Sequence, residues 1–236
     1  MKPNNKEKSR DKTKKASTWT GTKIALVVVG VLFVVLMIAS TIPMSVFSSL
    51  KGTQPGDMAT VAYTIYDDQN RPIVTSNVKL YNDTLAKGGT VFYSNPLQVP
   101  VNVTTMKNVT RIPVQYQQYQ NYFGLFRDEM NLIATGLSGM KVNEQKRLSL
   151  VMPKDPLETQ ISADQFALLV KPVNETRVNE QFALALTDHP QINLDNTTPV
   201  DQYLRTFYVK GISPDGLDMK YGYSTIDLQI ISLKTQ

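Results

Sequence analysis

The stretch GLSGMKVNEQKRLSLVMP, residues 136–153, is the most informative part of this sequence. Its first half is a turn of small and polar residues that follows a short apolar segment. Its second half, Lys146–Met152, has the composition of a β-strand, and Pro153 ends it. The stretch contains no nucleophile, no cluster of metal ligands and no phosphate-binding loop. Its structural and functional role must therefore be inferred together with the segments around it.

Those segments are mostly strand-like. Met58–Tyr66 alternates between apolar and polar residues, which predicts a half-buried strand. Ser213–Gly216, with the sequence Ser-Pro-Asp-Gly, is typical of a β-turn within a long hairpin. Further strands are expected at residues 72–76, 90–93, 146–152, 203–212, 217–221 and 224–233.

One short helix is expected beyond the N-terminal region, at Arg127–Ser138, whose apolar residues share one face. Residues 94–125 have little regular pattern and predict a loop or flap, with a strand across Val99–Val103. Residues 154–202 contain the apolar runs FALLV and FALAL and are interpreted as an inserted subdomain. The predicted class is α+β, mainly antiparallel β.

The composition excludes several kinds of site. The chain has 236 residues and no cysteine, so it has neither disulfides nor thiolate metal sites. The only histidine, His189, lies in Asp-His-Pro and is expected to be a solvated turn residue, since one histidine cannot build the usual metal clusters. We therefore expect no metal and no cofactor.

The net charge of +5 belongs to the N-terminal tail. Residues 1–23 hold eight basic and two acidic residues, which leaves 17 basic and 18 acidic residues for the rest. That remainder has no excess of positive charge, so we expect no nucleic-acid partner. The tail is interpreted as a basic cytoplasmic segment that sets the topology of a membrane anchor.

The anchor is expected at Ile24–Ile42, a run of 19 residues without a charge. As a helix it would span about 28 Å, close to the roughly 30 Å of a bilayer core. We expect a single transmembrane helix within residues 24–47 and a linker at residues 48–57, which places the rest outside the cell membrane. A cleaved signal peptide is the closest alternative, but its apolar region is usually shorter, and a buried core helix is another.

Five Asn-x-Thr sequons follow the apolar run, where chance in this composition would give about two. They begin at Asn82, Asn102, Asn108, Asn174 and Asn196. The excess favours a glycosylated domain at the cell surface, and chance in a surface rich in Asn and Thr is the alternative.

Residues 130–153 resemble the helix–turn–strand of FKBP-type peptidyl-prolyl isomerases. In that family a short helix ends in Leu-x-Gly-Met, and Lys-Val-Gly-Glu and a strand running to a proline follow. The matching residues are Leu137, Gly139, Met140, Lys141, Val142, Glu144, Lys146, Arg147 and Pro153. Asn143 stands in place of the usual glycine, and asparagine is the next residue best able to adopt left-handed geometry.

The resemblance extends to residues 56–81, 127–157 and 203–234. It implies an FKBP-like bent sheet around one short helix, with an insert-in-flap-like subdomain and one preceding transmembrane helix. Residues 58–153 and 203–236 would form the FKBP-like domain, and residues 154–202 the insert.

The resemblance also implies an apolar pocket beneath the helix. Rotation about an X-Pro bond faces a barrier of about 18–20 kcal/mol set by amide resonance, and a water-poor pocket favours the twisted amide without any nucleophile. The residues expected to line this pocket are Tyr63, Val74, Met130, Ile133, Leu157 and Ile226. Aliphatic residues replace most of the family's pocket aromatics, and the acidic group of the second strand is missing. Plain core packing is the alternative for Tyr63, Met130 and Ile133.

Three functions remain open. The first is a membrane-anchored extracytoplasmic isomerase or folding helper. Its partners would be unfolded or proline-containing polypeptides, which the insert would bind, and residues 24–42 would contact the membrane. The second is a non-catalytic FKBP-like binding or structural ectodomain at the cell surface. The third is an unrelated β-sandwich for adhesion or sugar binding, for which the aromatic run YQQYQNYF would serve. The sequence does not specify the oligomeric state.

Overall fold

The structure is a computed structural model that describes residues 21–41, 52–151, 157–187 and 202–235. The chain divides into two compact units, Met1–Phe47 and Ser48–Gln236. The described part of the first unit is helix α1, Gly21–Thr41. Within the described ranges, no helix has both the length and the apolar character that a membrane crossing requires.

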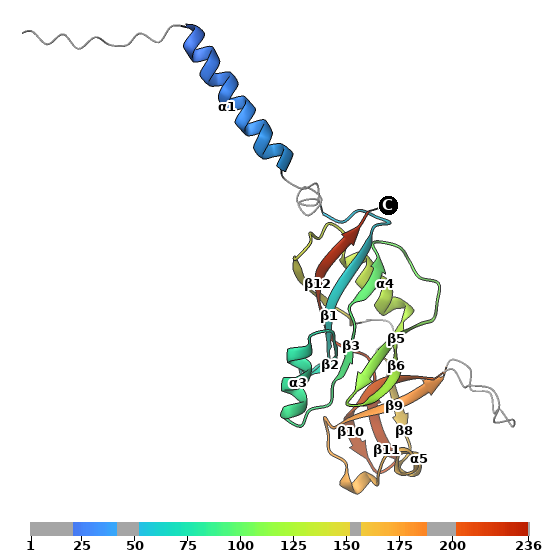
Figure 1. Cartoon of the computed structure of the whole chain (residues 1–236). Coiled ribbons are helices and arrows are strands. Elements are labelled where there is room, and N and C mark those ends of the chain that lie inside the picture. The colour runs from blue at the N-terminus through green and yellow to red at the C-terminus, as the bar shows by residue number, and fades with distance from the viewer. Residues whose placement is uncertain (1–20, 42–51, 152–156, 188–201, 236) are drawn as a thin grey trace, which may run out of the picture. The chain divides into compact units, whose positions relative to one another are not determined.

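The second unit is built on one twelve-stranded sheet that curls into a half-barrel (Figure 1). Ten strands follow each other in the order β7-β12-β1-β2-β3-β5-β6-β10-β11-β8, while β4 pairs with β1 and β9 pairs with β10. The strands are β1 Met58–Tyr66, β2 Pro72–Thr75, β3 Phe92–Ser94, β4 Leu97–Pro100, β5 Val109–Tyr116, β6 Tyr119–Phe126, β7 Gln145–Ser149, β8 Glu158–Ile161, β9 Gln181–Thr187, β10 Gln202–Ser213, β11 Gly216–Lys220 and β12 Thr225–Lys234. Most neighbours are antiparallel, and the pairs β2 with β3 and β6 with β10 are parallel.

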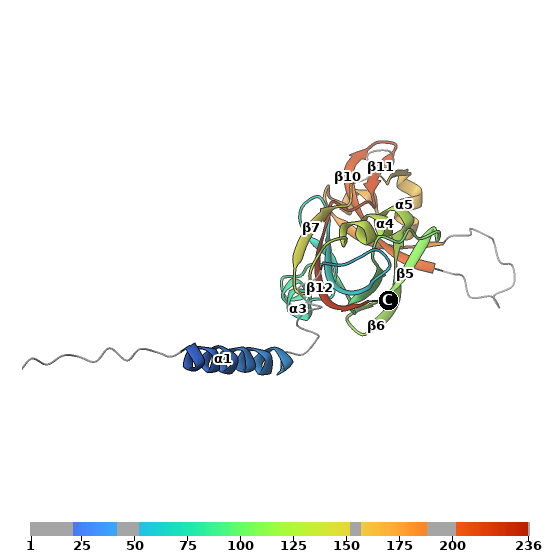
Figure 2. The same ribbon diagram turned by 90° about the horizontal axis from the view of Figure 1, so that it is seen from above.

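The sheet holds two apolar cores. The first core gathers 23 buried residues from β1 to β6, helix α4 (Arg127–Gly136), β12 and the loops between these elements, including Val61, Ile65 and Ile230. Figure 2 shows α4 within the curl formed by β7, β12 and β5. Helix α4 buries Glu129, Met130, Ile133 and Ala134 against these strands.

The second core is smaller and lies where β8 to β11 meet helix α5, Ala163–Leu169. Its buried members are Phe166, Phe207, Val209, Leu217 and Met219. Ser162 caps α5 and forms a capping box with Gln165, which explains why this run starts a helix. Strands β10 and β11 thus share a core with the predicted insert.

The expected fold class is wrong in two respects. The described residues contain four α-helices rather than a single helix plus a membrane span, and strands expected in separate subdomains join in one curled sheet. The sheet is continuous because the twelve-residue β10 pairs with β6 at Leu204 and with β11 from Tyr208 to Ser213. The predicted transmembrane helix at Ile24–Ile42 is likewise not supported, because no described helix meets the requirements for a membrane crossing.

The unpredicted helix α3, Val78–Ala86, buries none of its residues. A helix of this kind leaves no apolar stripe in its sequence, and the cap at Asn77, whose side chain accepts a hydrogen bond from the Leu80 N–H at 3.1 Å, is its main local signal. The expected loop or flap at residues 94–125 is mostly the hairpin of β5 and β6, which starts after residue 108.

Candidate functional site

The six residues expected to line an isomerase pocket are packed rather than open. Five of them, Tyr63, Val74, Met130, Ile133 and Ile226, belong to the first core, and each is at most 9% exposed. Leu157 is buried as well, but it lies outside that core. Tyr63 lines an open groove on the surface of the sheet, and none of the other five lines that groove or the cavities beside β8, η1 and β3.

Aromatic side chains fill the space beside the start of α4. The rings of Phe123 and Tyr223 stack with centroids 5.8 Å apart, and both are almost fully buried. Tyr203 lies against the backbone of Gly124, where an added Cβ would come within 2.2 Å of its ring. This close approach explains why a glycine sits in the middle of β6.

A buried ion pair completes this packing. The guanidinium of Arg205, on β10, donates hydrogen bonds to Glu129 of α4 at 2.7 and 2.9 Å, and neither side chain is exposed. A third bond runs from Arg205 to the carbonyl of Gly124 at 2.8 Å. The guanidinium carbon also lies 4.3 Å from the ring centroids of Phe126 and Tyr223, which is cation–π geometry.

Electrostatics at this pair favour the ionised form of Arg205. Burial alone would lower the pKa of Arg205, but the opposing charge of Glu129 contributes to raising it. Burial raises the pKa of the Tyr223 hydroxyl, which stays neutral and accepts a hydrogen bond from the Thr206 N–H at 3.1 Å. The pair thus joins β10 to α4 and offers no free base or acid for catalysis.

Sequence reasoning missed this pair, although a signal was present. Arg205 interrupts the run from Tyr203 to Val209, in which every other residue except Leu204 is buried. An arginine in a buried strand requires a partner, and Glu129 sits at the third position of the only helix that was predicted beyond the N-terminal region.

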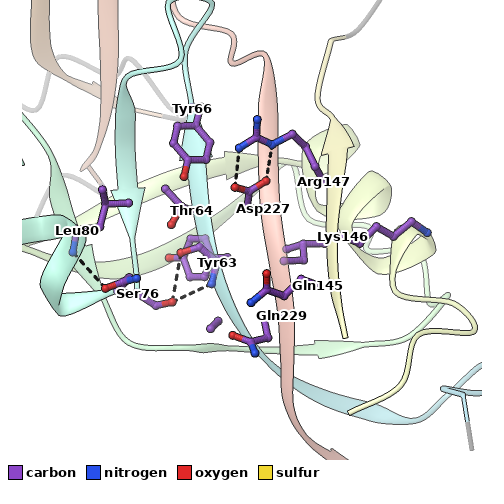
Figure 3. A pocket seen from close by; sticks show the side chains of 13 residues that line it. Tyr63, Thr64, Tyr66, Ser76, Leu80, Gln145, Lys146, Arg147, Asp227 and Gln229 are labelled. Carbon is purple, nitrogen blue, oxygen red and sulfur yellow. Dashed lines mark hydrogen bonds and ion pairs between the residues drawn. The ribbon is translucent and has the colours of Figure 1, made fainter. Parts of the chain in front are cut away.

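An open polar groove of about 570 Å³ lies on the outer face of β1, β12 and β7, beside the start of α3 (Figure 3). Arg147 and Asp227 form a two-bond ion pair across it, at 2.5 and 2.7 Å. The guanidinium of Arg147 lies 5.1 Å from the ring centroid of Tyr66. Burial, and then the charge of Asp227, raise the pKa of Tyr66.

On the side of the groove next to α3, the Ser76 hydroxyl accepts a hydrogen bond from the Tyr63 N–H at 2.8 Å.

This groove lacks the parts of a catalytic site. Both carboxylate oxygens of Asp227 already accept hydrogen bonds from Arg147, so Asp227 is not free to act as a general base. The Ser76 hydroxyl is held between the N–H and the carbonyl of Tyr63. Within the described ranges, no group of three His, Asp or Glu side chains could hold a metal ion.

The second core, by contrast, leaves apolar side chains in solvent. We define the α5–β9 surface as Leu168 and Leu169, which are 87% and 65% exposed, together with the half-buried Phe182, Leu184 and Leu186. The ring of Phe166 packs edge-on against Phe182 at 5.2 Å and joins the two elements. Strand β9 pairs only with β10, so its other edge has no partner strand within the described ranges.

Four of the five sequons fall on described residues. Asn82 lies on α3 and Asn174 in the short 3-10 helix η1, Val173–Glu175, while Asn102 and Asn108 lie in the segment between β4 and β5. All four are exposed. Asn196 and His189 lie outside the described residues, as does most of the basic tail.

The comparisons with known proteins supply no relative. The chain matches no protein-family model and no curated protein. The resemblance to FKBP-type isomerases therefore stays a prediction.

Proposed function

We propose that this chain is a folding helper that binds extended, apolar segments of other polypeptides on the α5–β9 surface. The observation that carries the proposal is the exposure of Leu168 and Leu169 on a helix of seven residues that is held to the molecule by one buried residue, Phe166. Burying a leucine side chain is worth about 1.5–3 kcal/mol, so adjacent leucines left in solvent favour a client that covers them.

The open edge of β9 adds backbone recognition to this apolar contact. An extended peptide can continue a sheet by pairing with the N–H and C=O groups of an edge strand, and its side chains then meet those of the strand. Ala183 and Ala185 are exposed on one face of β9, and Leu184 and Leu186 are half-buried on the other. Binding of this kind tolerates many sequences, as a folding helper requires.

The proposed function needs no isomerase chemistry. The six expected pocket residues are buried, and Arg205, Phe123 and Tyr223 occupy the space beside α4. This packing supports binding without catalysis. The isomerase prediction is decided by proline-limited refolding of an unfolded substrate protein with the full chain added. We expect no acceleration over the uncatalysed rate, and a saturable acceleration would establish an isomerase instead.

The binding proposal is tested with reduced, unfolded α-lactalbumin as the client. The full chain should suppress its aggregation, and the double variant Leu168→Ser/Leu169→Ser should require at least about tenfold more chain for the same protection. Met106→Ser is the matched control, because Met106 is 83% exposed and lies outside the surface. Equal loss in the control, or full protection by the double variant, would contradict the proposal.

A position at the cell surface is part of the same proposal. The exposure of the four described sequons supports it, because a glycan can be attached only to an accessible asparagine. Treatment of the chain from its native cells with an N-glycosidase should increase its gel mobility, and unchanged mobility would count against this location.

A further inference from the structure

A second surface, on the opposite side of the sheet from the first core, has a different chemistry. It is formed by the outward faces of β3, β5 and β6. Tyr93 pairs with Gln115, and Gln115 pairs with Gln120, so these three side chains form one row across the strands. Pro113 pairs with Tyr122 in the next row. We call these five residues, with Asn95, the tyrosine–amide face.

The face surrounds a hollow of about 500 Å³, within the range of roughly 300–1,000 Å³ that is usual for small-ligand sites. No charged side chain lines it. The residues that line it are Tyr93, Ser94, Asn95, Pro113, Val114, Gln115, Gln120, Asn121 and Tyr122. Those whose side chains share the outward face of β5 and β6 are Pro113, Gln115, Gln120 and Tyr122.

Its amides are available for a ligand. Gln115 donates one hydrogen bond, to the carbonyl of Gln117 at 2.7 Å. The side chains of Asn95 and Gln120 make no hydrogen bond to any residue in the described part of the chain. Each of these two unbonded amides presents two N–H donors and an acceptor, which matches a ligand whose groups also donate and accept.

One of the two tyrosines, Tyr93, is held in position, and the other, Tyr122, is exposed. Tyr122 is 53% exposed, so about half of a large apolar ring surface faces solvent. The ring of Tyr93 packs at 5.8 Å from that of Tyr81 on α3. The Tyr81 hydroxyl in turn accepts a hydrogen bond from the Gln117 N–H at 2.8 Å, in the turn between β5 and β6. These contacts preorganise the hairpin and reduce the entropy lost on binding.

From these features we infer that the tyrosine–amide face binds a neutral oligosaccharide. A sugar ring offers an apolar C–H face, which packs on a tyrosine ring, and hydroxyl groups at its rim, which both donate and accept hydrogen bonds to amides. A charged ligand would find no opposite charge in this lining, and a purely apolar one would leave the amides unpaired on burial. The inference goes beyond the proposed function and does not depend on it.

The test is titration of the full chain, by isothermal calorimetry, with three neutral trisaccharides: cellotriose, mannotriose and triacetylchitotriose. We expect saturable binding of at least one. Tyr122→Ala should weaken it by about fivefold or more, because a ring contact is lost. Gln120→Glu should weaken it as well, because this isosteric change removes the amide donors and adds a charge.

Tyr119→Ala is the matched control. Tyr119 lies on the same strand and is 62% exposed, but it pairs with Tyr116 on the other face. The control should bind as the unchanged chain does. The inference is overturned if none of the three sugars binds saturably, if Tyr122→Ala binds normally, or if the control loses as much. Preferential binding of an extended Gln/Asn-rich peptide would also overturn it.

Discussion

The two apolar cores of the sheet differ in how completely they are closed. Helix α4 buries four residues at the first core and holds a buried ion pair beside it, whereas helix α5 buries only Phe166 at the second core and leaves two leucines in solvent. One sheet thus supports both a closed interior and an open apolar surface. This difference places the proposed binding surface where the core is too small to cover its own helix.

Strand β10 belongs to both cores. Arg205 bonds to Glu129 beside the first core, while Phe207 and Val209, further along the strand, pack in the second. The turn between β1 and β2 forms a second link. Asp68 of that turn accepts hydrogen bonds from Tyr208 at 2.6 Å and from Lys220 at 2.7 Å. Substitutions at these links and within each core test whether the two cores unfold independently of each other.

The largest effect is expected for Arg205→Met. It leaves the carboxylate of Glu129 buried without its partner, which should lower the free energy of unfolding by about 3–5 kcal/mol. Urea denaturation of the full chain measures this loss. The double variant Arg205→Met/Glu129→Gln should recover part of it, because no unpaired charge remains buried. A loss below about 1 kcal/mol in the single variant would mean that the pair behaves as an exposed one.

A smaller loss is expected for Phe166→Ala. The change removes the only buried side chain of α5, at a usual cost of about 3–5 kcal/mol, and we expect the lower end because a small core collapses more readily around a cavity. Hydrogen exchange should accelerate in β8 to β11 and remain slow in β1 and β12. Equal acceleration in both regions would show that the two cores unfold as one unit.

The smallest effect is expected for Asp68→Asn, and it depends on pH. Burial alone would raise the pKa of Asp68, but the hydrogen bonds from Lys220 and Tyr208 outweigh it and hold the pKa below its ordinary value. A carboxyl whose pKa is depressed by folding contributes stability above its unfolded pKa of about 3.9, and this is lost as the pH falls through the folded pKa.

The measurement is the free energy of unfolding as a function of pH. Asp68→Asn should flatten the fall in stability below about pH 4 and should be less stable than the unchanged chain near neutral pH, by about 1 kcal/mol. The same slope in both chains at acid pH would contradict the role given to Asp68.

The sequence predicted the central strands well because their patterns are local. Met58–Tyr66 alternates as a half-buried strand does, and the structure places β1 at those residues. The helix expected at Arg127–Ser138 is α4, which ends at Gly136. Both have a buried face that repeats along the sequence, and that repetition is the signal that pattern reasoning detects.

The remaining features depend on contacts that leave no local pattern. Helix α3 buries no residue and so has no apolar period. The hairpin of β5 and β6 carries amides and tyrosines outward, which hides its alternation in residues 109–126. Whether Tyr63 and Ile133 line a pocket or fill a core depends on nonlocal packing, because the first core also contains Tyr223 and Ile226, which are far away in the sequence.

The pairing of β1 with β12 has a consequence for how the molecule folds. Met58 pairs with Lys234 and Tyr66 with Thr225, so this pair of neighbouring strands joins segments from distant parts of the chain. Such nonlocal pairing gives a high contact order, and folding is expected to take milliseconds to seconds rather than microseconds. Until β12 has been synthesised and has paired, β1 exposes an unpaired strand edge to other chains. A protein proposed to protect unfolded clients would therefore itself need protection from aggregation at this stage of folding.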